Sequence, residues 1–177
     1  MAMMETAELA RRIRSVAYLE GDFVLRSGKR SKYYLDKYLF ETDPEILTEL
    51  GRRFAMHAAD ADQIAGAELG GVALAAAASM ASGKPFVIVR NAKKAYGTGN
   101  LIEGKLIPNA KVLLVEDIAT TGGQIIEAAR ALTEAGTIVT KIVCVIDRME
   151  GARENIKLAG YKFDALLTRL DLGLQTK

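Results

Sequence analysis

Short apolar runs alternate along the chain with stretches in which apolar residues recur at helical spacing. The apolar runs have the length of strands and cover residues 63–66, 85–89, 112–115, 138–146 and 163–168. The helical spacing predicts helices over residues 6–19, 44–58, 72–81, 125–134 and 152–158. Strands that alternate with helices favour an α/β fold, in which helices flank both faces of a mostly parallel central sheet.

A different pattern precedes this alternation. Two short strand-like pieces flank the turn residues Ser27 and Gly28, which predicts a hairpin within residues 23–36. Its second strand carries Tyr33 and Tyr34, whose side chains point to opposite faces because they are adjacent in a strand. One ring can therefore pack inward while the other stacks on a planar ligand; packing of both rings against protein is the alternative.

Composition narrows the class of protein. The chain has 177 residues, of which 50% are hydrophobic and 26% charged, and its net charge is +2. This balance suits one domain, and the small charge without a dense Lys/Arg run argues against a general nucleic-acid binder. The longest apolar run, residues 72–78, is too short to cross a bilayer, and the charged N-terminal stretch does not resemble a signal peptide. A cytoplasmic protein is therefore expected.

Cysteine and histidine offer little chemistry. The single cysteine, Cys144, lies in an apolar run and is interpreted as a small buried residue that can form no internal disulfide. The single histidine, His57, is interpreted as an ordinary helix residue. Because there is no second histidine and the cysteine lies in a different element, no zinc site is expected.

The most specific signal is the run from Val112 to Gln124. A buried strand is followed by the carboxylates Glu116 and Asp117, and then by a turn of small residues, 120–123, that leads into a helix. The amides of such a turn and the helix dipole suit a terminal phosphate. A carboxylate pair would repel the phosphate itself, but it accepts hydrogen bonds from sugar hydroxyls and favours a cationic centre. The run therefore suits a phosphorylated ribose with free hydroxyls, and it is neither a Walker loop nor a dinucleotide-binding fingerprint.

Other polar turns follow the neighbouring strands. They are the glycine-containing turn 67–71, the basic loop 90–100 and the charged segment 147–153. Because ligands of parallel sheets bind beyond the carboxyl ends of the strands, we expect these turns to share one site with the turn at 120–123.

These motifs carry a resemblance to a known family. The run from Val112 to Gln124 resembles the 5-phosphoribosyl-1-pyrophosphate (PRPP) motif of type I phosphoribosyltransferases. The hairpin resembles the hood over the base in the orotate phosphoribosyltransferases of that family, residues 90–97 resemble their mobile catalytic loop, and Asp147-Arg148 resembles the strand end that holds orotate. The similarity to this branch extends over essentially the full length.

The resemblance implies a fold, a reaction and partners. The fold is one phosphoribosyltransferase domain over residues 1–177, with a small hood from about residue 1 to 40 plus the C-terminal segment. The reaction transfers phosphoribosyl from PRPP to orotate and gives orotidine 5′-monophosphate and pyrophosphate, in pyrimidine biosynthesis. Mg²⁺ is the implied cofactor, carried mainly by PRPP rather than by a protein metal site. A homodimer is implied, in which the mobile loop reaches the partner's site; no nucleic acid or membrane is implied as a partner.

The resemblance also implies residue roles. The catalytic residues would be Arg90, Lys94, Glu116 and Asp117. The PRPP-binding residues would be Arg90, Asn91, Lys94, Tyr96, Glu116, Asp117, Ile118, Ala119, Thr120, Thr121, Gly122, Gly123 and Gln124. The orotate-binding residues would be Arg26, Tyr33, Tyr34, Thr120 and Arg148.

The chain departs from the family pattern at three places. Asn91 and Tyr96 stand where the family loop usually has lysine and histidine, and the turn 68–71 lacks the lysine that some members have. Two alternative functions accompany the orotate hypothesis, and the altered loop supports only the second of them. One is a type I phosphoribosyltransferase for another base; the other is a PRPP-sensing regulator that keeps the site without catalysis.

Overall fold

The central sheet decides where every other element lies. In the computed structural model, which describes residues 3–24, 28, 30–91 and 100–174, six strands form this sheet in the order β5-β4-β3-β6-β7-β8. Their bounds are β3 Gln63–Ala67, β4 Phe86–Val89, β5 Ile102–Glu103, β6 Lys111–Ala119, β7 Ile138–Asp147 and β8 Phe163–Thr168. The short edge strand β5 is antiparallel to β4, and the other neighbours are parallel. The predicted mostly parallel sheet is confirmed, and the carboxyl ends of its parallel strands lie at one edge.

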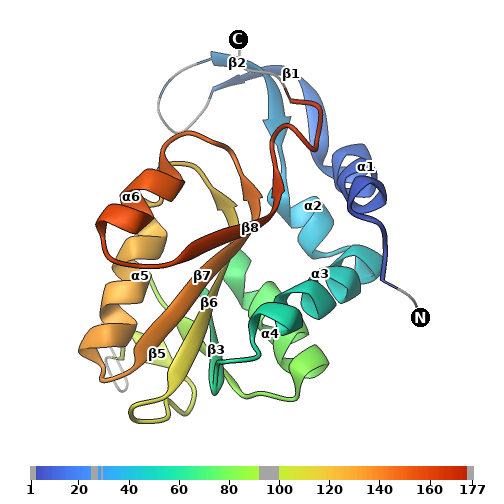
Figure 1. The fold of residues 1–177 in the computed structure, drawn as a ribbon. Coiled ribbons are helices and arrows are strands. Elements are labelled where there is room, and N and C mark those ends of the chain that lie inside the picture. The colour runs from blue at the N-terminus through green and yellow to red at the C-terminus, as the bar shows by residue number, and fades with distance from the viewer. Residues whose placement is uncertain (1–2, 25–27, 29, 92–99, 175–177) are drawn as a thin grey trace.

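Helices cover both faces of the sheet (Figure 1). One face packs against α1 Thr6–Ala17, α2 Lys37–Glu41, α3 Pro44–His57 and α4 Gly70–Ser82. The other packs against α5 Gly123–Glu134 and α6 Ala152–Leu158. The strand β6 serves both cores, because its alternate residues Leu113 and Leu114 belong to opposite faces.

The predicted hairpin is present as a separate two-stranded sheet. It pairs β1 Tyr18–Val24 with β2 Arg30–Leu35 in antiparallel register, and it lies at the top of Figure 1, beyond the central sheet. The first helix ends at Ala17 rather than Leu19, because β1 begins directly after it.

Two further elements differ from the prediction. The short helix α2 was not predicted, since five residues are too few to show helical periodicity. The strand β6 continues to Ala119 rather than ending near Val115, so Glu116 and Asp117 lie within the strand and not after it. Both differences concern the candidate site.

Small residues bring α4 close to the sheet. A Cβ atom on Gly66 of β3 would lie 2.1 Å from the carbonyl oxygen of Gly71 in α4, and one on Gly51 of α3 would lie 2.7 Å from the carbonyl oxygen of Ala77. These approaches are shorter than any side chain permits. Glycines therefore set two spacings, the one between α4 and the sheet and the one between α4 and α3.

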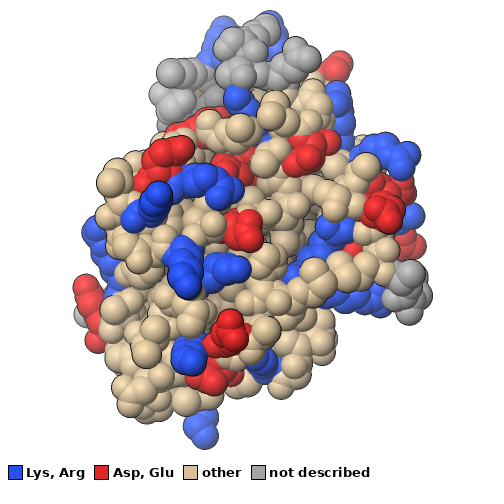
Figure 2. Space-filling view, in the orientation of Figure 1, with Lys and Arg blue, Asp and Glu red and all other residues tan. Residues whose placement is uncertain are grey.

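The remaining predictions from single residues can be compared directly. Cys144 is fully buried in β7, as expected, and burial raises the pKa of its thiol. His57 lies at the end of α3, and burial, assisted by Lys141, lowers the pKa of its imidazole. On the face drawn in Figure 2, basic and acidic side chains are interspersed. Within the described ranges, no helix is long and apolar enough to span a bilayer.

Candidate active site at the carboxyl edge of the sheet

Four predicted site segments meet at the carboxyl edge of the sheet. The amide of Glu68, after β3, donates to the carbonyl oxygen of Val89 at 2.8 Å, next to Arg90. The amide of Arg148, after β7, donates to the carbonyl oxygen of Ala119 at 2.9 Å, next to Thr120. Because β3 pairs in parallel with β6, the turns after β3 and β4 lie beside the turns after β6 and β7. The turns that the sequence predicted to share one site are therefore adjacent.

The turn after β6 presents backbone amides to solvent. Gly122 is the N-cap residue of α5 and has φ of 81°, a value that favours glycine, and no side chain caps the helix. Gly123 and Gln124 begin the helix and are exposed, so their amides belong to the first turn, where the helix supplies no acceptor. The side-chain amide of Asn155 in α6 donates to the carbonyl oxygen of Thr121 at 2.9 Å and holds the turn from behind. We call residues 120–124 the amide turn.

The two adjacent carboxylates of β6 have different surroundings. Because side chains alternate along a strand, Glu116 and Asp117 leave it in opposite directions. Glu116 is half-buried and its carboxylate accepts a hydrogen bond from the amide of Asp117 at 3.1 Å. Asp117 is only 3% exposed and is directed toward α2 and α4.

Asp117 is held from two sides. Its Oδ2 atom forms an ion pair of 2.5 Å with Nζ of Lys37, and its Oδ1 atom accepts a hydrogen bond from the amide of Ile118. A Cβ atom on Gly70 would lie 1.6 Å from Asp117 Oδ2 and 2.9 Å from Oε1 of Glu41, so both carboxylates approach the backbone of α4. We call Lys37, Glu41 and Asp117 the buried acid cluster.

Burial and mutual repulsion change the acidity of this region. Burial and then the charge of Asp117 raise the pKa of Glu41 to about 8. The same two causes raise the pKa of Glu116 well above its usual range. Burial opposes the charge of Lys37, but the hydrogen bond and the attraction from Asp117 outweigh it and raise the pKa of Lys37. At neutral pH, Glu41 therefore holds a proton while Lys37 is charged.

The structure describes some of the residues predicted to bind orotate and pyrophosphate, and others lie outside the described ranges. Arg148 borders the amide turn, but its Nη2 atom pairs with Oε1 of Glu150 at 2.9 Å. Arg90 follows β4, with its Nε atom 3.9 Å from Oε2 of Glu68, and Asn91 is exposed beside it. The predicted residues Arg26, Lys94 and Tyr96 lie outside the described residues.

The tyrosine pair behaves as its strand position predicts. Tyr33 stacks on Tyr18 with ring centroids 5.5 Å apart and packs against the core. Tyr34 is 42% exposed and lies beside Phe23, with ring centroids 5.6 Å apart. One ring therefore packs inward and the other remains accessible.

Sequence reasoning missed Lys37, Glu41 and Gly70 as members of the site. Lys37 and Glu41 lie on the unpredicted helix α2, some 80 positions before their partner Asp117. The one local signal is Asp36, which caps α2 by accepting a hydrogen bond from the amide of Tyr38. Such a cap can indicate the helix, but it cannot indicate which strand the helix faces.

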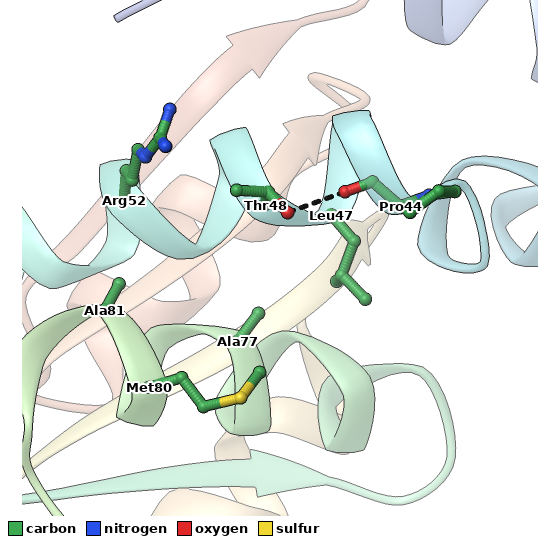
Figure 3. A pocket seen from close by; sticks show the side chains of 7 residues that line it. All are labelled: Pro44, Leu47, Thr48, Arg52, Ala77, Met80 and Ala81. Carbon is green, nitrogen blue, oxygen red and sulfur yellow. Dashed lines mark hydrogen bonds between the residues drawn. The ribbon is translucent and has the colours of Figure 1, made fainter. Parts of the chain in front are cut away.

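A separate groove lies between α3 and α4 (Figure 3). It has a volume of about 440 Å³ and is lined by Pro44, Leu47, Thr48, Arg52, Ala77, Met80 and Ala81. This lining contains one charged side chain and no carboxylate. It therefore lacks the groups that a sugar phosphate requires, and the carboxyl edge of the sheet remains the candidate active site.

Comparison with known proteins identifies the class. The phosphoribosyl transferase domain family matches residues 44–162, which include the carboxyl ends of β3, β4, β6 and β7. The chain therefore belongs to the phosphoribosyltransferase family. An orotate phosphoribosyltransferase from Natronomonas pharaonis is 45% identical over 172 residues, which are 97% of this chain and 98% of the relative. One from Methanocella arvoryzae is 44% identical and covers 95% of each chain. Within the family, the chain belongs with the orotate phosphoribosyltransferases.

Solved structures agree with this placement. A crystal structure of orotate phosphoribosyltransferase from Mycobacterium tuberculosis superposes with a TM-score of 0.86 at 33% identity, over 96% of this chain and 99% of that one. The same enzyme in complex with PRPP gives a TM-score of 0.82 at 31% identity, over 96% and 99%. An adenine phosphoribosyltransferase from Trypanosoma brucei, 16% identical with a TM-score of 0.71, shares the fold.

Proposed function

We propose that the chain transfers the phosphoribosyl group of PRPP to nitrogen N1 of orotate and releases pyrophosphate. The observation that carries this proposal is the amide turn, which follows Glu116 and Asp117 of β6 and borders Arg148, the residue after β7. One edge of the sheet thus combines donors for a phosphate, acceptors for ribose hydroxyls and a guanidinium for an anionic base.

The amide turn would bind the 5′-phosphate of PRPP. Its amides at Gly123 and Gln124 lie at the positive end of the α5 dipole and are exposed. The hydrogen bond from Asn155 of α6 to the carbonyl oxygen of Thr121 would hold the turn in place for this phosphate.

The two carboxylates would act on the ribose. Glu116, which is half-buried, would accept hydrogen bonds from the ribose hydroxyls. The negative charge of Asp117 would stabilise the positive charge that develops at the anomeric carbon. The fixed position of Asp117 means that little reorganisation is required as this charge forms.

Arg148 and Tyr34 would hold orotate. A guanidinium matches a carboxylate in charge and in geometry, and Arg148 lies beside Thr120 at the sheet edge. The exposed ring of Tyr34 would stack on the planar base. Arg26 is assigned to the same ligand by the resemblance alone.

We propose Mg²⁺ as the cofactor, bound to the oxygens of PRPP. The ion would be held by pyrophosphate and ribose oxygens and by water. When bound, the ion would neutralise the leaving pyrophosphate. Arg90, and Lys94 of the loop, would add cationic charge there.

Loss of orotate absorbance on addition of PRPP and Mg²⁺ tests the substrate and the reaction together. Orotate should be consumed, whereas hypoxanthine and adenine should not replace it. Binding of PRPP without release of pyrophosphate would instead support the regulator. Lys94→Ala should lower kcat far more than it weakens orotate binding, because its partner is the departing pyrophosphate; an equal loss in both would contradict that role.

We propose a homodimer as the working form. Beyond the resemblance, the support is apolar surface on α3 and α4, where Met56 is 61% and Met80 is 79% exposed. Sedimentation velocity should give a dimer, and mixing two inactive variants, Lys94→Ala and Glu116→Gln, should restore part of the activity if the loop of one subunit serves the other. A fully active monomer would contradict both statements.

A further inference from the structure

The buried acid cluster contains more groups than ribose binding requires. Asp117 alone would supply a negative charge near the ribose, yet α2 places Lys37 and Glu41 directly against it. Glu41 is 3% exposed, and its Oε1 atom accepts no hydrogen bond from the described residues. A hydrogen bond between Glu41 and Asp117 is among the causes that raise the pKa of Glu41. A buried carboxylate without a donor is costly, so this arrangement favours the protonated form of Glu41.

Resting on the proposed function, we propose that Lys37 and Glu41 are positioning residues that hold Asp117 as a single anion, oriented for PRPP. Lys37 supplies the counter-charge at 2.5 Å from Asp117 Oδ2. Glu41 supplies a carboxyl group that is neutral when protonated and that approaches Gly70 from the same side as Asp117. The cluster then contains one cation and one anion.

A second negative charge would disturb this balance. The charged groups that act on Glu41 are Asp117 of β6 and, at the start of its own helix, Lys37 and Asp36. From α4 the neighbour is the backbone of Gly70. When Glu41 loses its proton, one ammonium group must serve two buried carboxylates. Lys37 is then drawn from Asp117, and the potential at the PRPP site becomes more negative.

The pKa of Glu41 is raised to about 8, so Glu41 loses its proton at the upper edge of the physiological pH range. Affinity for PRPP should therefore fall as the pH rises through 8. A glutamine at position 41 keeps the shape and cannot ionise, so it removes the fall. A purely structural role for Glu41 would leave the shape of the pH profile unaltered.

The test measures the dissociation constant of PRPP with Mg²⁺ by calorimetry at pH 7, 8 and 9. The ratio of the wild-type constant to that of Glu41→Gln should rise about tenfold between pH 7 and pH 9, as expected for one ionisation near pH 8. The ionisation of PRPP itself cancels in this ratio. Glu49→Gln is the matched control, since Glu49 is also 3% exposed but pairs with Arg53 on α3; its ratio should stay constant.

Variants of Lys37 give an independent test of the proposal. Lys37→Met should weaken PRPP binding at pH 7 by about 10²-fold and leave orotate binding within threefold, while Lys37→Arg should restore part of the PRPP affinity. A constant Glu41→Gln ratio, or equal losses of PRPP and orotate binding in Lys37→Met, would overturn the proposal. Because binding is measured separately from turnover, an inactive wild type that binds PRPP would contradict the proposed reaction and not this inference.

Discussion

The buried acid cluster and the amide turn lie at the same edge of the sheet, and each lies at the start of a helix that follows a strand. Gly70 begins α4 and Gly123 begins α5. Around Gly70 the space is full, since an added Cβ atom would lie 1.6 Å from Asp117 Oδ2. Around Gly123, no described atom other than those of its chain neighbours and its own helix backbone lies within 4 Å of such an atom.

This difference separates two ways of preparing a site. In the buried acid cluster, protein groups already satisfy the charge of Asp117, so its position is set before any ligand arrives. In the amide turn, Gly123 and Gln124 are exposed and no described side chain caps the helix, so an anion could bind to the first amides of α5. Pre-set charge suits stabilisation of a short-lived cation, and open donors suit recognition of a stable phosphate.

Alanine at the two helix starts should give the largest contrast. Gly70→Ala must displace Asp117 from its pair with Lys37 and should lower the free energy of unfolding by about 3 kcal/mol or more. Gly123→Ala has room and should change it by less than about 1 kcal/mol, with helix propensity in its favour. Urea unfolding followed by circular dichroism measures both. Equal effects at the two positions would contradict the comparison.

The next effect is a dependence of stability on pH. Glu41 has a pKa of about 8 in the folded protein and an ordinary value of 4.5 when unfolded. Between these values the folded state binds the additional proton, so its stability is greatest at low pH and declines as the pH rises toward 8. The free energy of unfolding should therefore fall by about 1–3 kcal/mol more in the wild type than in Glu41→Gln between pH 5.5 and 8.

The difference between the two proteins isolates Glu41. His57, with its lowered pKa, stabilises the fold as the pH rises, but it is present in both proteins and cancels. Parallel curves for the wild type and Glu41→Gln would show that Glu41 is ionised in the folded state.

The sequence predicted the amide turn better than the buried acid cluster. The amide turn is local: strand, glycines and helix follow one another within residues 112–134, so the pattern is complete in the printed order. The buried acid cluster joins α2 to β6 and α4, and no local pattern records that contact. The alternation of β6 could have shown that Glu116 and Asp117 diverge, had the strand been extended beyond Val115.

The parallel sheet and its helical layers follow from the same reasoning, and the elements that were missed have a physical reason. The alternation of strands and helices predicted the parallel sheet and both helical layers. The edge strand β5 has two residues, and α2 has five, which is too short for either period to appear. The hairpin was found from its turn residues, whereas the start of β1 at Tyr18 was concealed by the apolar end of α1.

Removing the hydrogen bond that holds the amide turn should have a smaller effect, seen in the affinity for PRPP. Asn155→Ala removes the hydrogen bond to the carbonyl oxygen of Thr121, and the turn then has to be ordered by the ligand. The dissociation constant of PRPP should rise about three- to tenfold, equivalent to about 1 kcal/mol. Lys157→Ala, on the same helix, is the control and should have little effect. An unchanged PRPP affinity in Asn155→Ala would mean that the turn is ordered without α6.

The smallest effect concerns Arg148, whose guanidinium pairs with Glu150 at 2.9 Å across partly exposed side chains. Orotate carries a carboxylate and would compete with Glu150 for this guanidinium. Exposed ion pairs contribute about 0.2–1 kcal/mol, so Glu150→Gln should tighten orotate binding by about two- to fivefold. Glu154→Gln removes the same charge from the first turn of α6 and controls for general electrostatics. Equal tightening in both variants would indicate a long-range effect of charge, whereas tightening confined to Glu150→Gln identifies Arg148 as the anion receptor of the site.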